Sequence, residues 1–254
     1  MKQLISIAIG WLLLTTLSYA KDSIINTQQL SEHVYLLYGQ GGNIAVSVGD
    51  DGIYIIDDQF AKLSNEIKQS ISELRPGSAE FVINTHHHGD HTGGNENFAN
   101  AGAHVIAHHN VHKRLVAKHG AASGFVPRIS FSQDLTLHFN NQQAHVVHYA
   151  NAHTDGDAVI FFNQDNIVHM GDIYFNLGSL PFVDVDSGGS VAGVLAALDD
   201  VLRKIDANTQ VIPGHGPLTD RAGLLAYAKL VQKAKAVMLK AMQNEASLAQ
   251  LLAA

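Results

Sequence analysis

The chain has no cysteine, and this absence excludes two features of many exported proteins. It cannot be held at a membrane as a lipoprotein through a modified cysteine, and its fold needs no disulfides. Basic residues are also few. The chain has 16 lysines and arginines against 23 aspartates and glutamates, which gives a formal net charge of -7. Proteins that bind nucleic acid normally present a basic face, so this balance argues against a nucleic-acid partner.

A hydrophobic run long enough for a typical transmembrane helix is missing from the N-terminal region. An apolar stretch over residues 4–17 follows a basic start and leads to a small-residue motif ending at Ala20. This is the pattern of a secretory signal peptide, so we expect residues 1–20 to be removed and residues 21–254 to form a single domain. The expected location is periplasmic or secreted, without a stable membrane anchor after cleavage. An uncleaved anchor is the alternative.

Apolar periodicity predicts how strands and helices alternate along the chain. Runs with strand character, separated by glycine-containing turns, indicate an antiparallel meander at residues 34–38, 43–48 and 53–56. Helical spacing is seen at residues 60–74, 110–119, 191–205 and 219–252. Further strands are expected at residues 81–85, 104–107, 129–139, 143–149, 158–162, 167–170 and 210–212. This order fits the α/β (α+β) class, with two mixed β-sheets covered by helices on their outer faces.

The most unusual stretch follows the strand expected at residues 81–85. It contains four histidines and an aspartate within six positions, in the order His86-His87-His88-Gly89-Asp90-His91. Imidazoles and carboxylates are ligands that suit divalent zinc. His86 and His88 are two positions apart, and Asp90 and His91 are adjacent. This spacing allows a loop to divide its ligands between two neighbouring metals, whereas a helical His-x-x-x-His pair serves one metal. A surface histidine tract that binds metal adventitiously is the alternative.

Three later side chains stand where ligands from other strands would be needed. His153 lies in a polar turn before an expected strand, Asp172 follows another strand, and His215 lies between Pro-Gly and Gly-Pro after a third. Taken singly, a histidine or aspartate in a loop is more often exposed or capping. The three together, in this order, favour a metal site.

With these residues the chain resembles the metallo-β-lactamase superfamily of metallohydrolases. Residues 85–91 match its Thr-His-x-His-x-Asp-His signature, and the later ligands follow in the expected order. Ile55-Ile56-Asp57 resembles the family's early motif, a strand ending in aspartate. The resemblance implies an αββα sandwich with the site at one edge of the two sheets. It further implies one zinc at His86, His88 and His153, a second at Asp90, His91 and His215, and Asp172 bridging them.

Two adjacent cations provide the chemistry of a hydrolase. They lower the pKa of a shared water towards neutrality and polarise the attacked carbonyl or phosphoryl oxygen, so we expect a metal-bridging hydroxide as nucleophile. Asp90 is the expected catalytic residue, shuttling a proton to the leaving group. Asp57 is expected just behind the ligands, holding a ligand histidine or the loop, and a plain strand-end cap is the equal alternative. Two zinc ions are the default, although iron or manganese fits the same ligands.

Asp172 narrows the expected activity within the family. In one branch a metal-ligating cysteine is followed by a lysine that grips an anionic substrate, whereas this chain has Asp172 there and no lysine or arginine in residues 173–189. The carboxylate resembles the arrangement in glyoxalase II-type thioesterases and in lactonases. We therefore expect an exported dinuclear zinc hydrolase acting on a small ester, thioester, lactone or lactam. The alternatives are a β-lactamase proper and, in another class, a non-catalytic metal-buffering protein.

The other histidines have no ligand partners at motif spacing, and we expect structural or surface roles for them. They are His33, His104, His108, His109, His112, His119, His138, His145, His148 and His169. His87 fills a variable position of the signature and is not counted as a ligand. The apolar side chains of residues 173–189 are expected to form a pocket wall rather than a dimer contact. The oligomeric state cannot be deduced from the sequence.

Overall fold

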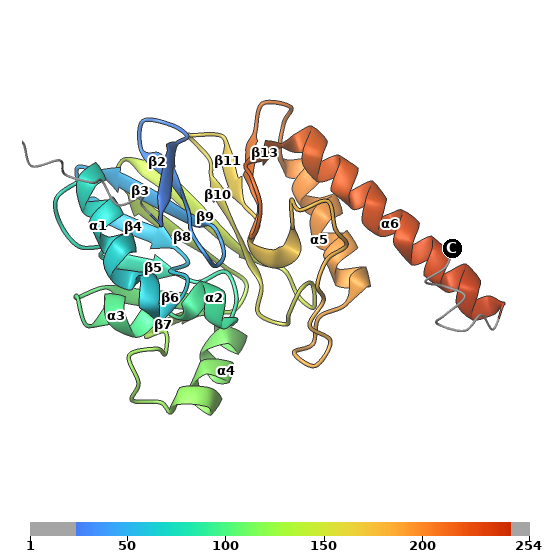
Figure 1. The fold of residues 1–254 in the computed structure, drawn as a ribbon, viewed down its shortest axis with the longest axis horizontal. Coiled ribbons are helices and arrows are strands. Elements are labelled where there is room, and N and C mark those ends of the chain that lie inside the picture. The colour runs from blue at the N-terminus through green and yellow to red at the C-terminus, as the bar shows by residue number, and fades with distance from the viewer. Residues whose placement is uncertain (1–23, 245–254) are drawn as a thin grey trace, which may run out of the picture.

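The computed structural model describes residues 24–244, which form two β-sheets packed face to face between outer layers of helices (Figure 1). This is the αββα arrangement that the resemblance implies. The expected signal peptide, residues 1–20, and the last part of the expected C-terminal helix lie outside the described residues. Among the described residues, no helix combines the length and the apolar character needed to cross a membrane.

The first sheet has seven strands in sequence order. They are β1 (Asn26–Gln29), β2 (Val34–Tyr38), β3 (Ile44–Gly49), β4 (Gly52–Ile56), β5 (Phe81–Ile83), β6 (His104–His108) and β7 (Ile129–Phe131). Strands β1 to β4 pair antiparallel, in agreement with the expected meander, whereas β4 to β7 pair in parallel. Because neighbouring parallel strands end at the same edge of a sheet, the loops after β4 and β5 start side by side.

The second sheet has six strands in the order β13-β12-β11-β10-β9-β8. Their bounds are β8 (Asp134–Phe139), β9 (Gln142–His148), β10 (Ala158–Phe162), β11 (Ile167–His169), β12 (Gln210–Ile212) and β13 (Thr219–Asp220). Only β11 and β12 pair in parallel here, so the loops that follow them also start at one edge. Asn140 and Asn141 join β8 to β9 with φ of 57° and 56°, the left-handed conformation that a tight hairpin turn requires.

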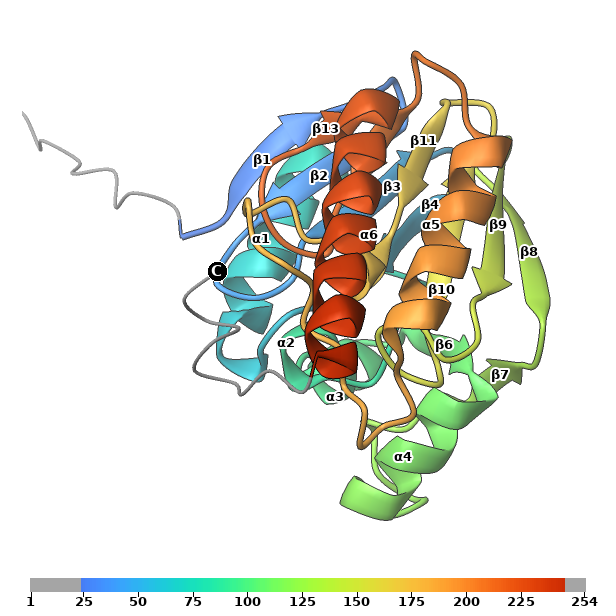
Figure 2. The same ribbon diagram turned by 90° about the vertical axis from the view of Figure 1, so that its right-hand side faces the viewer.

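Helices cover both outer faces. A 3-10 turn (Ala61–Leu63) and α1 (Ser64–Leu74) lie on the first sheet, and α5 (Val191–Lys204) and α6 (Arg221–Gln243) lie side by side on the second (Figure 2). The shorter helices are α2 (Gly89–Thr92), α3 (Asn95–Ala99), α4 (His109–His119) and a 3-10 turn, η2 (Gly171–Ile173).

Three apolar layers hold the sheets in place. Ile67 of α1 packs on the first sheet, and Leu198 of α5 packs with α6 on the second. Between the sheets lies a third layer that includes Ile56, Ile83 and Ile160, each fully buried. Full burial of a side chain of this size stabilises the fold by about 1.5–3 kcal/mol. The layer between the sheets therefore fixes their relative position, and with it the loops at their shared edge.

One expectation about strands was wrong, and one strand was missed. Residues 129–139 were expected as one strand, but they form β7 in the first sheet and β8 in the second. The chain passes from one sheet to the other at Ser132 and Gln133, where glutamine takes a position that the alternation would give to an apolar residue. Strand β1 was not expected, because all four of its residues are polar and exposed.

Candidate metal centre

The seven side chains that the sequence singled out converge at one edge of the sandwich. The loop after β5 and the short helix α2 carry four of them, and the loop before β10, the turn η2 after β11 and the loop after β12 carry one each. The ligand atoms form two groups, each with all atoms within 4.8 Å of one another: His86, His88, His153 and Asp172; and Asp90, His91 and His215.

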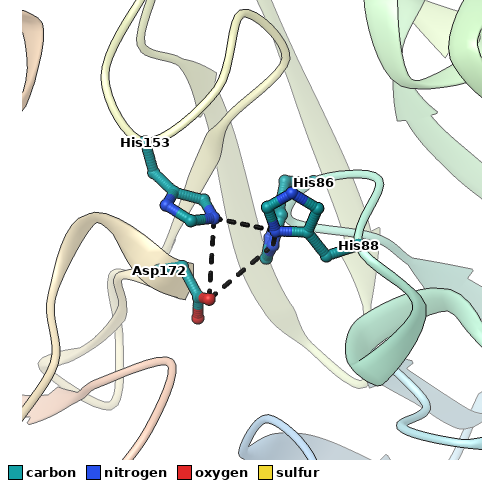
Figure 3. A group of neighbouring side chains, drawn as sticks. All are labelled: His86, His88, His153 and Asp172. Carbon is teal, nitrogen blue, oxygen red and sulfur yellow. Dashed lines mark hydrogen bonds and ion pairs between the residues drawn. The ribbon is translucent and has the colours of Figure 1, made fainter. Parts of the chain in front are cut away.

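In the first group, three ring nitrogens face a common point (Figure 3). His88 Nδ1 lies 3.0 Å from His86 Nε2 and 3.0 Å from His153 Nε2. These histidines come from two loops, separated by 65 positions between His88 and His153. Three imidazole nitrogens at such distances form one face of a tetrahedral zinc site.

The second group lies beside the first. His91 Nε2 and His215 Nε2 are 3.3 Å apart, and Asp90 Oδ2 lies 3.2 Å from His215 Nε2 and 3.6 Å from His91 Nε2. The rings of His86 and His91 have centroids 4.3 Å apart, so the two groups are in contact.

Asp172 points one carboxylate oxygen at each group. Its Oδ2 lies 3.8 Å from His86 Nε2 and 3.6 Å from His153 Nε2, whereas its Oδ1 lies 3.1 Å from His91 Nε2 and 3.5 Å from His215 Nε2. Oδ1 is buried, yet no described residue donates a hydrogen bond to it. An unpaired buried carboxylate oxygen is costly without a cation. The arrangement therefore fits a carboxylate that bridges two metal ions.

Hydrogen bonds from the core orient two of the histidines. Asp57, fully buried after β4, accepts from the backbone and hydroxyl of Thr85 at 2.7 and 2.8 Å and from His91 Nδ1 at 2.7 Å. Because the Thr85 hydroxyl donates to Asp57, its oxygen accepts from His86 Nδ1 at 3.0 Å. Both rings thus donate from the outer nitrogen and turn the other nitrogen towards the site, the orientation that metal ligation requires.

The same pattern holds for two further histidines, but their acceptors lie in the loop between η2 and α5. His153 Nδ1 lies 2.8 Å from the carbonyl oxygen of Phe182, and His88 Nε2 lies 3.0 Å from Asp184 Oδ2. Four of the rings are therefore held by an acceptor at the outer nitrogen, with the other nitrogen directed at the site.

Burial and neighbouring charges shift the pKa values of several candidate ligands. Although burial opposes its charge, His91 and His215 hold the pKa of Asp172 well below its usual range. Burial lowers the pKa of His86 well below its ordinary value, so this ring is neutral. Against the effect of burial, the neighbouring carboxylates of Asp172 and Asp90 raise the pKa of His215 to about 9. Protons on the second group thus occupy the role of a cation, and metal binding must release them.

Two glycines make room for the ligands. A Cβ atom at Gly214 would overlap Asp172 Oδ1, and one at Gly42 would overlap the His91 ring. Any larger residue at either position would displace a ligand. The close approach of backbone to these side chains is a use to which glycine is suited.

The open side of the site has an apolar margin. Phe175 stacks on His215 with ring centroids 5.5 Å apart. The ring of Phe182 is T-shaped to that of His153 and tilted to that of His88. Four side chains of the adjoining loop are more than half exposed: Leu177, Leu180, Phe182 and Val185. Asp90 and His215 are 29% and 23% exposed, so the second group is the more accessible to solvent.

Sequence reasoning missed Asp184, and it counted Thr85 as part of the signature without assigning it a role. Asp184 lies in a loop without periodicity, and its one sequence signal is a serine three residues later, a spacing typical of a side chain that closes its own turn. Asp184 also groups with His87 and His88, although His87 Nδ1 is buried without a hydrogen-bond partner among the described residues. Of the other histidines, His169 is buried and bonded to backbone at both ring nitrogens, as its expected structural role requires.

Several known proteins are similar to this chain. A hydroxyacylglutathione hydrolase from Polaromonas sp. is 32% identical over 157 residues, which cover 60% of this chain and 54% of that protein. A metallo-beta-lactamase type 2 from Bacillus cereus is 25% identical over 183 residues, covering 71% and 69%. The solved structure of a metallo-beta-lactamase from Pontibacter korlensis has a TM-score of 0.72 at 20% identity, covering 82% of this chain and 99% of that one, and therefore shows the fold.

The chain spans about half the length of the first curated relatives, 54% and 48%. The sequence profile described as "Metallo-beta-lactamase superfamily" matches residues 63–215, which is more than half of the chain and contains all seven candidate ligands. Both the fold class and the resemblance drawn from the ligand pattern are thereby confirmed. This chain belongs to the metallo-beta-lactamase superfamily.

Proposed function

We propose that the chain is an exported, dinuclear zinc-dependent hydrolase that cleaves a small ester, thioester, lactone or lactam. The observation that carries the proposal is the bridging position of Asp172, with Oδ2 facing one group of ligand atoms and Oδ1 facing the other. A protein that only stores metal gains nothing from a carboxylate shared between two adjacent positions. Export to the periplasm or the medium is proposed from the signal-peptide pattern of residues 1–20.

The bound metals would supply a water activated at neutral pH and would polarise the carbonyl oxygen of the substrate. The chain itself supplies the proton transfer. Although burial raises it, the hydrogen bond with His215 and the charge of His91 lower the pKa of Asp90. Asp90 is therefore a charged carboxylate at the open side of the site, able to accept the proton of the attacking water and to pass it to the leaving group.

Relatives and charge together indicate the substrate class. Hydroxyacylglutathione is a thioester, and several similar proteins carry the name of its hydrolase. Residues 173–189 beside the site contain no lysine or arginine to pair with an anionic substrate, and four of their apolar side chains are exposed. We therefore favour a small molecule with an uncharged acyl group. No nucleic acid is expected as a partner, given the net charge of -7.

A β-lactamase proper is the second candidate, favoured by the relative from Bacillus cereus. The rival of another class is a periplasmic metal-binding protein that buffers metal, to which 16 histidines would contribute. The two rivals differ from the first proposal in measurable ways, since a lactamase prefers a cephalosporin and a buffer holds many loosely bound ions without turnover.

The test is a substrate panel on protein whose metal content is quantified, including iron and manganese. We expect two tightly held zinc ions and turnover of a chromogenic lactone or thioester. Asp90→Asn in zinc-loaded protein should lower kcat by about 10²–10⁴-fold, the usual contribution of general acid–base catalysis. Asp186→Asn, an exposed carboxylate in the neighbouring loop, is the matched control. Unchanged turnover in Asp90→Asn would remove the role assigned to Asp90, and many weakly held ions with no turnover would favour the buffer.

A further inference from the structure

The two candidate metal positions are supported by different parts of the molecule. His91 of the second position is oriented by Asp57, which is fully buried at the end of β4. His88 and His153 of the first position are oriented by Asp184 and by the carbonyl oxygen of Phe182, both in the surface loop between η2 and α5. Two of the three histidines of the first position are therefore oriented by a loop, whereas His86 of that position and His91 of the second are oriented from the core.

Asp184 is held firmly within that loop. Its Oδ1 accepts from the backbone N–H of Ser187 at 3.0 Å, which leaves Oδ2 directed at His88 Nε2, also at 3.0 Å. Its own backbone N–H donates to the carbonyl oxygen of His153 at 2.9 Å, and its carbonyl oxygen accepts from Gly189 at 2.8 Å. The residue thus connects the turn at 184–189 to both of the loop-supported histidines.

The carboxylate decides which nitrogen of His88 carries the proton. A carboxylate only accepts, so Nε2 must donate to it and Nδ1 keeps the lone pair. Nδ1 is the nitrogen that lies 3.0 Å from both His86 Nε2 and His153 Nε2. Without an acceptor at position 184, no hydrogen bond holds the proton on Nε2, and the lone pair of Nδ1 is no longer fixed towards the site.

We propose that Asp184 is a positioning residue that sets the affinity of the first metal position. The carbonyl oxygen of Phe182, in the same loop, orients His153 of that position. This inference rests on the proposed function only in taking the seven side chains as metal ligands.

Asp184→Asn separates this role from a structural one. The amide oxygen of asparagine still accepts from Ser187, so the turn is kept. Its NH₂ group faces His88 Nε2 and donates, which requires Nε2 to accept and moves the proton to Nδ1, the nitrogen needed for ligation. Removing such a partner typically costs about 10–100-fold in metal affinity. Asp184→Glu restores an acceptor and should recover part of the affinity, and Asp186→Asn is the control in the same loop.

The experiment is a zinc titration of the metal-free full chain against a chromophoric chelator, together with ¹⁵N spectra of the histidine rings. We expect the wild type and Asp186→Asn to bind two equivalents tightly, and Asp184→Asn to bind one equivalent about 10–100-fold more weakly with the other unchanged. The ring of His88 should carry its proton on Nε2 in the wild type and on Nδ1 in Asp184→Asn.

The possible failures are distinguishable. If the wild type binds no zinc tightly, both the proposed function and this inference fall. If the wild type binds two equivalents and Asp184→Asn matches it at both positions, the inference is wrong and the proposed function stands. Equal weakening of both positions would likewise contradict the assignment to the first one. Thermal unfolding of the metal-free variants separates these outcomes from a loss of fold, and Asp184→Glu supplies the decision if Asp184→Asn does not fold.

Discussion

At the scale of single residues, the site depends on side chains that fix the protons of the ligands. Asp57 and Thr85 do this from the core, and Asp184 does it from a loop. The ligands themselves were predictable, because histidine and aspartate at motif spacing are unusual in a sequence. The roles of Thr85 and Asp184 were not predictable, since a threonine or an aspartate in a loop has many common roles. Only the structure shows which nitrogen each of them faces.

Asp57 provides the residue-scale prediction. Its φ of 63° is left-handed, a conformation that asparagine tolerates, so Asp57→Asn tests the carboxylate without straining the backbone. The asparagine amide has one acceptor oxygen where the carboxylate has two, so either the backbone N–H of Thr85 or His91 Nδ1 loses its acceptor at a fully buried position. We expect the free energy of unfolding of the metal-free protein to fall by about 1–3 kcal/mol, the cost of an unsatisfied buried donor.

Urea unfolding measures this change, and a zinc titration of the same variant should show weaker binding at one position. Asp134→Asn is the control, because the Asp134 side chain is 66% exposed. An unfolding free energy equal to that of the wild type would show that Asp57 is no more than a strand-end cap.

At the scale of elements, short segments with weak sequence signals position the site. The helix α2 has four residues and carries Asp90 and His91, and the turn η2 has three and carries Asp172. Neither segment is long enough to show a helical period, so the sequence predicted only loops there. The longer elements, such as α1 and α5, were predictable because their apolar residues recur along one face over three turns or more.

The start of α4 provides an element-scale prediction about pH. His108 Nδ1 accepts from the backbone N–H of Asn110 at 3.2 Å, its Nε2 lies 3.1 Å from the Ser132 carbonyl oxygen, and its ring stacks on His148 at 3.6 Å. Burial and the nearby His148 lower the pKa of His108 to about 4. The folded state thus binds a proton less readily than the unfolded state, in which the pKa is about 6.5.

The contribution of His108 to stability is therefore complete above about pH 6.5 and is lost as the pH falls towards about 4. His108→Asn keeps a side chain suited to the N-cap of α4 but does not titrate. We expect the free energy of unfolding of the wild type to decrease more steeply than that of His108→Asn between pH 7 and pH 4.5. Both proteins carry the same metal ligands, so a difference between them reports on His108. If urea titrations give the same pH dependence of the free energy of unfolding for both, the contribution assigned to His108 is contradicted.

At the scale of the whole molecule, the site joins two sheets that each contribute part of it. Parallel pairing of β4 with β5 and of β11 with β12 directs four loops to the same edge of the sandwich (Figure 1). The αββα class was predictable from the order of strands and helices and from the family signature. The passage from the first sheet to the second at residues 132–133 was not, because one polar residue, Gln133, in an otherwise regular alternation is also compatible with a single strand.

Since the ligands come from both sheets, bound metal should stabilise the whole fold. A single ion present at about 1,000 times its dissociation constant contributes about 4 kcal/mol, which for a domain of this size corresponds to a rise in Tm of roughly 8–16 °C. We expect a chelator to lower Tm by at least this amount and added zinc to restore it, as measured by differential scanning calorimetry. A Tm that does not respond to chelation would show that the site is not occupied in the folded protein.

The central claim is that two metal ions share the carboxylate of Asp172. The most direct measurement is the number and affinity of zinc ions bound per chain by the wild type and by Asp172→Ala, determined by metal analysis and competitive titration. We predict two tight equivalents for the wild type and weaker binding at both positions for the variant, because each group loses one oxygen. A single tight equivalent in the wild type, or a variant that keeps one position at full affinity, would contradict a bridging role.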